Sequence, residues 1–121
     1  MARILLAEDD SATRDLVRRA LTADGHDVVA TQDGNEALDT LLAAPAQTAL
    51  LISDVDMPGL DGIELARRAI AANPALRVVL MTGLSEGLAR TDGLKPQLRR
   101  FVSKPFTLEQ IRTVVREALA G

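Results

Sequence analysis

Hydrophobic positions along this chain fall into two kinds of segment that alternate. Short runs made mostly of apolar residues, typical of strands buried on both faces of a sheet, lie within 3–7, 28–31, 49–53, 77–81 and 100–102. Between most of them, apolar residues recur at helical spacing, which predicts helices at 11–24, 35–44, 62–72 and 108–119. Strands that alternate with helices indicate a parallel sheet with helices on both faces. We therefore expect one α/β domain, a three-layer sandwich, over residues 1–121.

Polar residues suited to begin a helix stand at the start of each helical segment. The expected N-cap residues are Asp10 or Ser11, Asn35, Asp61 and Thr107. Thr107 is followed three residues later by Gln110, which is the pattern of a capping box. A fourth helix before the last strand is harder to place, because Gly87, Gly93 and Pro96 interrupt residues 85–99. We expect it to be short or irregular.

Composition narrows the classes of function. Only 2% of residues are aromatic and the net charge is −3, so the chain has neither base-stacking rings nor the basic balance of a nucleic-acid-binding protein. The arginine pairs at 18–19, 67–68 and 99–100 are expected to be solvated surface charges. The chain has no cysteine, and no apolar run reaches membrane-spanning length. We expect a cytoplasmic protein whose partners include neither nucleic acid nor a membrane.

Four of the five expected strands are followed by a chemically useful side chain. Glu8 and Asp9 follow the first strand, Asp54 the third, Thr82 the fourth and Lys104 the fifth. The carboxyl ends of parallel strands meet at one edge of a sheet, where such folds bind ligands, so we expect these groups to converge. Clustered carboxylates repel one another unless a cation joins them, and oxygen ligands without histidine or cysteine favour Mg²⁺.

A site of this kind is suited to phosphate. A carboxylate such as Asp54 can attack phosphorus and form an acyl phosphate, while a metal ion and Lys104 neutralise the transferring oxygens. Each residue alone has a plainer explanation, because a single acid at a strand end more often caps a helix or lies in solvent. Their coincidence at four strand ends favours the site. His26, the only histidine, is expected to be a turn residue without a metal.

The same residues carry a resemblance to a known family. The segments ILLAEDD (4–10), LLISDVDMPGLDG (50–62), VVLMTG (78–83) and FVSKPF (101–106) follow the order, and nearly the spacing, of response-regulator receiver domains of two-component signalling. The resemblance extends from Arg3 to Leu119. It implies a flavodoxin-like (βα)5 fold with strand order 2-1-3-4-5, and a signalling phosphoacceptor limited to self-catalysed phosphotransfer and autodephosphorylation.

By this resemblance, Asp54 is the phosphoacceptor of a phosphorelay. The donor would be a phosphohistidine of a histidine kinase or histidine phosphotransferase. Asp9 would bind Mg²⁺ directly, Glu8 partly through water, and Asp54 would complete the carboxylate ligands. Asp56 would offer its backbone carbonyl to the metal, and its own carboxylate would lie at the rim of the site.

The resemblance also implies a conformational switch. Thr82 would hydrogen-bond a phosphoryl oxygen, Gly83 would leave room for attack, and Lys104, joined to Pro105 by a cis bond, would pair with the phosphoryl group. Inward movement of Thr82 would free space into which Phe101 rotates. This rotation would change a protein-binding face made by the fourth strand, the fifth strand and the last helix, where a downstream target would bind. An ordinary core aromatic is the plainer interpretation of Phe101.

Two other classes of protein share part of the pattern. A Mg²⁺-dependent phosphatase of the haloacid-dehalogenase type also has Asp-x-Asp after a strand, but after its first one. A Toprim-like nuclease pairs a glutamate after the first strand with Asp-x-Asp after the third, yet it needs neither Thr82 nor Lys104 and requires a basic surface. Within the receivers, MARILLAEDD (1–10) and DGIELARRA (61–69) are similar to single-domain adaptors of bacterial cell-cycle-regulated proteolysis. We therefore expect a stand-alone receiver or a fragment of a larger regulator or hybrid kinase.

Overall fold

Helices and strands alternate through the computed structural model, which describes residues 2–83, 91 and 93–120. In chain order the elements are β1 (Arg3–Ala7), α1 (Ser11–Ala23), β2 (Asp27–Thr31), α2 (Gly34–Ala43), the 3-10 turn η1 (Pro45–Gln47), β3 (Leu50–Asp54), α3 (Gly62–Ala72), β4 (Arg77–Thr82), β5 (Leu98–Ser103) and α4 (Leu108–Ala120). The strands and helices expected from the pattern are present, with ends shifted by one or two residues. Within the described ranges, no helix is long and apolar enough to cross a membrane.

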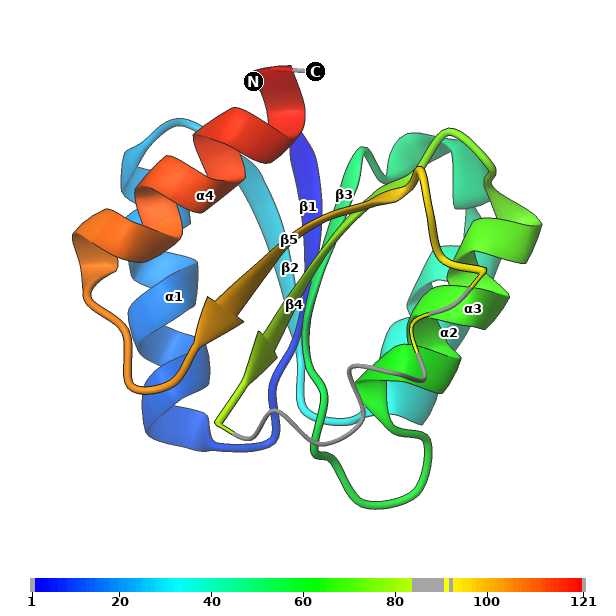
Figure 1. Cartoon of the computed structure of the whole chain (residues 1–121), viewed down its shortest axis with the longest axis horizontal. Coiled ribbons are helices and arrows are strands. Elements are labelled where there is room, and N and C mark those ends of the chain that lie inside the picture. Colours follow the sequence, from blue (N-terminus) through cyan, green and yellow to red (C-terminus); the bar gives the residue numbers. More distant parts are fainter. Residues whose placement is uncertain (1, 84–90, 92, 121) are drawn as a thin grey trace.

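The five strands form one parallel sheet in the order β2-β1-β3-β4-β5, which confirms the predicted topology. Helices α1 and α4 cover one face of the sheet, and α2 and α3 cover the other (Figure 1). The register pairs Asp54 with Met81 and Thr82 with Ser103. The carboxyl ends of β3, β4 and β5 therefore lie at the same edge.

The core is aliphatic and divided by the sheet into two clusters. Alternate strand residues such as Leu51 and Leu80 face α2 and α3, while Ile52 and Met81 face α1 and α4. Every residue of β3 is buried, which explains why this strand reads as an unbroken apolar run. Each fully buried aliphatic side chain contributes about 1.5–3 kcal/mol relative to its exposed state.

Three of the four predicted helix caps are confirmed. The Asp10 carboxylate accepts the Thr13 N–H at 2.9 Å, and the Asp61 carboxylate accepts the Glu64 N–H at 2.9 Å. The capping box before α4 is also present: the Gln110 N–H donates to the Thr107 hydroxyl at 3.1 Å, and the Thr107 N–H donates to the Gln110 side chain at 2.7 Å.

The predicted cap of the second helix was wrong. Asn35 lies inside α2, and the cap is Asp33, whose carboxylate accepts the Glu36 N–H at 2.7 Å. The reason is tertiary. A Cβ atom at Gly34 would overlap the Leu60 carbonyl oxygen, so only a glycine allows the first turn of α2 to pack this closely.

The expected fourth helix between β4 and β5 falls mainly on residues 84–90 and 92, which lie outside the described part of the chain. Among the described residues there, 93–97 form turns, and Leu94 is fully buried in the α2–α3 cluster. Strand β5 then begins at Leu98, two residues before its predicted start.

Candidate functional site

Three carboxylates come together at the carboxyl edge of the sheet, as the sequence predicted. Glu8 follows β1 and is fully buried, Asp9 beside it is exposed, and Asp54, the last residue of β3, is 4% exposed. One oxygen of each carboxylate lies within 4.8 Å of the others. The parallel topology explains this convergence, because β1 and β3 are hydrogen-bonded neighbours that end at the same edge.

Lys104 joins two of these carboxylates. Its Nζ lies 2.7 Å from Glu8 Oε1 and 3.1 Å from Asp54 Oδ2. The Lys104 N–H donates to the Thr82 carbonyl at 2.9 Å, so the backbone that carries the lysine is fixed to the end of β4. The Lys104–Pro105 peptide bond is cis, as the resemblance to receiver domains implied.

Burial and charge oppose each other in this cluster. Burial raises the pKa of both Glu8 and Asp54 above the usual range of a carboxyl group, although the hydrogen bond and positive charge of Lys104 act against the increase. Burial lowers the Lys104 pKa, but its hydrogen bond to Glu8 and the charges of Glu8 and Asp54 outweigh this effect and raise that pKa overall. One ammonium group therefore does not balance the three neighbouring carboxylates when all are ionised.

The donor set of the cluster fits Mg²⁺. It consists of carboxylate oxygens from Glu8, Asp9 and Asp54, with no histidine or cysteine in the group. Hard divalent ions prefer such oxygen ligands. A bound Mg²⁺ would offset the negative charge of the carboxylates that Lys104 does not balance.

Two contacts that position Glu8 were not predicted. The Asp10 N–H donates to Glu8 Oε2 at 3.0 Å, and Arg14 Nη1 donates to the Glu8 carbonyl at 3.0 Å. Asp10 thus caps α1 with its side chain and orients Glu8 with its backbone. No sequence signal distinguishes Arg14 from the other arginines of α1, because its role depends on how the helix packs beside the strand end.

Gly62 is a further unpredicted member of the site. A Cβ atom at this position would overlap the carbonyl oxygen of Asp54, and the Gly62 N–H donates to the Val55 carbonyl at 3.0 Å. The start of α3 therefore lies directly against the backbone of Asp54. The Asp-Gly pair that ends MPGLDG is the signal that could have pointed to it.

The remaining predicted residues surround this cluster at different depths. The Asp56 N–H donates to Asp54 Oδ1 at 3.3 Å, and Asp56 itself is exposed, at the rim. Thr82 is the buried last residue of β4. Phe101 is 38% exposed and pairs with Leu80, two residues before the end of β4. Its ring lines an open groove of about 640 Å³ between β5 and α4.

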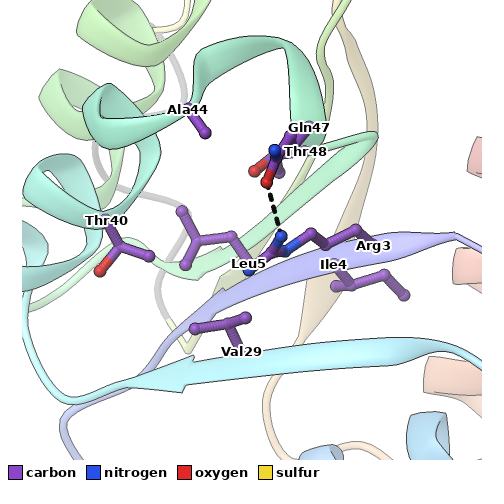
Figure 2. A pocket seen from close by; sticks show the side chains of 8 residues that line it. All are labelled: Arg3, Ile4, Leu5, Val29, Thr40, Ala44, Gln47 and Thr48. Carbon is purple, nitrogen blue, oxygen red and sulfur yellow. Dashed lines mark hydrogen bonds between the residues drawn. The ribbon is translucent and has the colours of Figure 1, made fainter.

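A small, partly open pocket lies at the other end of the sheet. Figure 2 shows Arg3 and Thr40 among the residues around it, with Arg3 hydrogen-bonded to the Gln47 side chain at 2.7 Å. Its volume is about 20 Å³, which is room for about one water molecule. Arg3 begins β1, whereas Glu8 follows its end, so this pocket is separate from the acidic cluster.

Comparisons with known proteins agree with the geometry. The response regulator receiver domain model matches residues 4–116. The response regulator receiver protein CpdR of Brucella abortus (strain 2308) is 37% identical over 119 residues, which cover 98% of each chain. The chain spans about half the length of other curated relatives that it matches, the response regulators MprA of mycobacteria.

Two solved structures are similar throughout. The receiver domain of the hybrid histidine kinase CckA is 32% identical with a TM-score of 0.82, over 98% of this chain and 99% of that one. The response regulator TrrA of Thermotoga maritima, solved in complex with Mg²⁺-BeF, is 27% identical with a TM-score of 0.84, over 98% of this chain and 100% of that one. The family is a signalling family and not one of conventional enzymes. The resemblance first carried by four short motifs thus extends over the whole fold, and the chain belongs to the response regulator receiver domains of two-component systems.

Proposed function

We propose that this domain receives a phosphoryl group on Asp54 from a phosphohistidine of a histidine kinase or histidine phosphotransferase. The observation that carries the proposal is the convergence at Asp54. Lys104 Nζ lies 3.1 Å from its carboxylate, and oxygens of Glu8 and Asp9 lie within 4.8 Å. Membership of the receiver family supports the same assignment.

The transfer is a displacement at phosphorus. A carboxylate oxygen of Asp54 attacks the phosphorus atom, and the bond between phosphorus and the donor's imidazole nitrogen breaks. The electron pair of that bond stays on the imidazole, which takes up a proton from solvent. The product is an acyl phosphate on Asp54, which water later hydrolyses. Lys104 binds the transferred oxygens and Thr82 donates its hydroxyl to one of them, so that positioning and charge supply most of the catalysis.

Glu8, Asp9, Asp54 and the backbone carbonyl of Asp56 would hold Mg²⁺. When bound, Mg²⁺ would neutralise the acidic cluster and the charge on the phosphoryl oxygens. The oxygen-only donor set supports this assignment. Burial raises the pKa of Glu8 and Asp54, and a divalent cation would favour the ionised form of both carboxyl groups.

The phosphodonor has to reach Asp54 over the carboxyl edge of the sheet. An open groove of about 380 Å³ lies on this route, lined by Thr13, Leu16, Lys104, Pro105 and Phe106. Leu16, which is 46% exposed, and Phe106 give this groove an apolar surface beside the Lys104 side chain. We assign this groove to contact with the helical surface that carries the donor histidine.

The downstream target would bind the face formed by β4, β5 and α4. Phe101 lines the groove on this face and is 38% exposed, which leaves its ring free to move toward Thr82 when the Thr82 hydroxyl turns to the phosphoryl group. The face would thereby differ between the phosphorylated and unphosphorylated chain.

Intact-mass spectrometry tests the phosphoacceptor. The native chain, Asp54→Asn and Asp56→Asn are each incubated with Mg²⁺ and a small phosphodonor such as acetyl phosphate. Asp56→Asn is the matched control, because it removes an exposed acid from the same loop. One phosphoryl group is expected on the native chain and on Asp56→Asn, and none on Asp54→Asn or without Mg²⁺. An adduct that persists in Asp54→Asn contradicts the proposal.

The same samples separate the two hydrolase alternatives. A Mg²⁺-dependent phosphatase or a Toprim-like nuclease would turn over a phosphomonoester or cleave a nucleic acid without a stable adduct on the chain. Multiple turnovers that depend on Asp54 would favour those classes over a receiver.

A further inference from the structure

A third groove lies at the edge of the sheet opposite the acidic cluster, between the C-terminal half of α4 and the turn that joins α1 to β2. Its volume is about 440 Å³. The residues that line it are Asp24, His26, Arg112, Arg116, Leu119 and Ala120. Arg112 and Arg116 are one helical turn apart, so both lie on the face of α4 that borders this turn.

The simplest structural role for these arginines would be to bind the free carbonyls at the end of α1. For three of these carbonyls that role is already filled. The carbonyl oxygens of Ala20, Leu21 and Thr22 accept backbone N–H groups of the turn 24–26, at 3.2, 3.2 and 3.0 Å. These three carbonyls therefore do not need the guanidinium groups.

The charges in the groove are also unbalanced. Asp24 is the one acid that lines it, and its Oδ2 lies 3.5 Å from Arg112 Nε. Arg116 has no hydrogen bond or ion pair within the described part of the chain. His26 Nδ1 is buried without a hydrogen-bond partner among the described residues, and Arg112 Nε, also buried, has only the ion pair with Asp24. Two guanidinium groups thus face one carboxylate, in a chain whose net charge is −3.

We propose that this groove binds the phosphate group of a small ligand, held by the guanidinium groups of Arg112 and Arg116 beside the His26 imidazole. Guanidinium groups bind such oxyanions through paired N–H donors. The apolar side chains of Leu119 and Ala120 provide a surface for the rest of the ligand. The site is independent of the proposed phosphotransfer, because Asp54 and Lys104 lie at the other edge of the sheet.

Nuclear magnetic resonance of the His26 ring tests the site. His26 is the only histidine, so its ring signals need no assignment by mutation. The full chain is titrated with inorganic phosphate at constant pH without Mg²⁺, against sodium chloride at equal ionic strength. Phosphate is expected to produce a saturable shift with a dissociation constant on the order of 1 mM, and chloride is not.

Two double variants with the same change of charge locate the binding. Arg112→Gln with Arg116→Gln is expected to abolish the saturable shift, and Arg116→Gln alone to weaken binding about tenfold. Arg67→Gln with Arg68→Gln, on α3, should bind phosphate as the native chain does. The amide spectrum of each variant shows whether it remains folded, and the exposed Arg116→Gln provides the test if the double variant does not. A shift that never saturates, or one equally weakened in both double variants, overturns the proposal.

Discussion

Lys104 Nζ lies 2.7 Å from Glu8 Oε1, although the two residues are 96 positions apart in the chain. Glu8 is fully buried, and the same ammonium group lies 3.1 Å from Asp54. Among the described side chains, Lys104 alone forms ion pairs with these two acids. This lysine is therefore the direct counterion of a pair of carboxyl groups whose ionisation is made unfavourable by burial.

Replacing that counterion should destabilise the domain. Lys104→Met leaves Glu8 and Asp54 without a cation, and we expect the free energy of unfolding to fall by about 2 kcal/mol, less than for a fully buried pair because the lysine is 26% exposed. Urea unfolding without Mg²⁺ measures the loss. Lys95→Met is the matched control, because Lys95 is the only other lysine, is exposed and also precedes a cis proline. Equal loss in both variants would show that the ion pairs contribute nothing.

The Asp54→Asn variant should be more stable than the native chain at neutral pH without Mg²⁺. Burial raises the pKa of Glu8 and Asp54, so the folded state binds the protons of these two carboxyl groups more tightly than the unfolded state does. The stability that the two protonated carboxyl groups contribute is fully present below the ordinary carboxyl pKa of about 4. It is lost as the pH rises through their raised pKa values in the folded state. At a pH above these pKa values, the Asp54→Asn substitution should therefore increase the free energy of unfolding by about 1–2 kcal/mol.

Urea unfolding of the two chains at a series of pH values measures this difference. Hydrogen bonds lower the pKa values of Asp10, Asp15 and Glu64, so the stability that these groups contribute is lost as the pH falls. Both chains contain these three groups, so their contributions cancel in the comparison. Added Mg²⁺ should stabilise the native chain more than Asp54→Asn, because it binds the folded state through that carboxylate. A stability difference that does not change with pH would contradict the electrostatic explanation.

Close packing at Gly62 should make this position intolerant of a side chain. Gly62→Ala places a methyl group against the Asp54 carbonyl, and we expect it to cost about 1–3 kcal/mol of stability. It should also reduce the Mg²⁺-dependent rise in melting temperature, because the backbone of Asp54 has to shift. Gly83→Ala is the control for stability, since its nearest neighbour would be the Lys104 Cβ at 3.9 Å, an ordinary contact. Equal melting temperatures for both variants would refute this packing argument.

The two candidate caps of α2 can be separated by substitution. Asp33→Ala removes the acceptor of the Glu36 N–H and should cost about 1 kcal/mol, whereas Asn35→Ala, inside the helix, should change stability by less than about 0.5 kcal/mol. Thermal unfolding compares them. A larger effect at Asn35 would contradict the cap seen in the structure.

The fold was predictable because its signals are local. A strand buried on both faces, such as β3, requires consecutive apolar residues, and the carboxyl ends of neighbouring parallel strands necessarily meet. The grouping of Glu8, Asp9, Asp54 and Lys104 followed from these two facts alone. This grouping could be predicted without information on how the helices pack around the sheet.

The errors arose where distant packing decides a local choice. The start of α2 depends on the contact between Gly34 and Leu60, and the contact of Arg14 with Glu8 depends on how α1 packs. Strand β5 begins two residues before its predicted start, because Arg99 separates Leu98 from the predicted segment and the register shift relative to β4 lies at this position. Such pairings cannot be read from one segment at a time.

The proposed switch makes Phe101 the residue to observe on phosphorylation. Its ring is 38% exposed, and Phe106 is the only other phenylalanine, so a ring-labelled sample gives two sets of signals. Mg²⁺ with a small phosphodonor should shift the Phe101 signals and shield the ring from a soluble paramagnetic probe, while Asp54→Asn should show neither change. Thr82→Ala should still take up phosphate on Asp54 but leave Phe101 exposed, because the hydroxyl that draws β4 toward the phosphoryl group is missing. If the Phe101 signals stay unchanged when the native chain is fully phosphorylated, the proposed switch is wrong. Phe101 would then be an ordinary surface residue of β5, and the downstream target would bind another face.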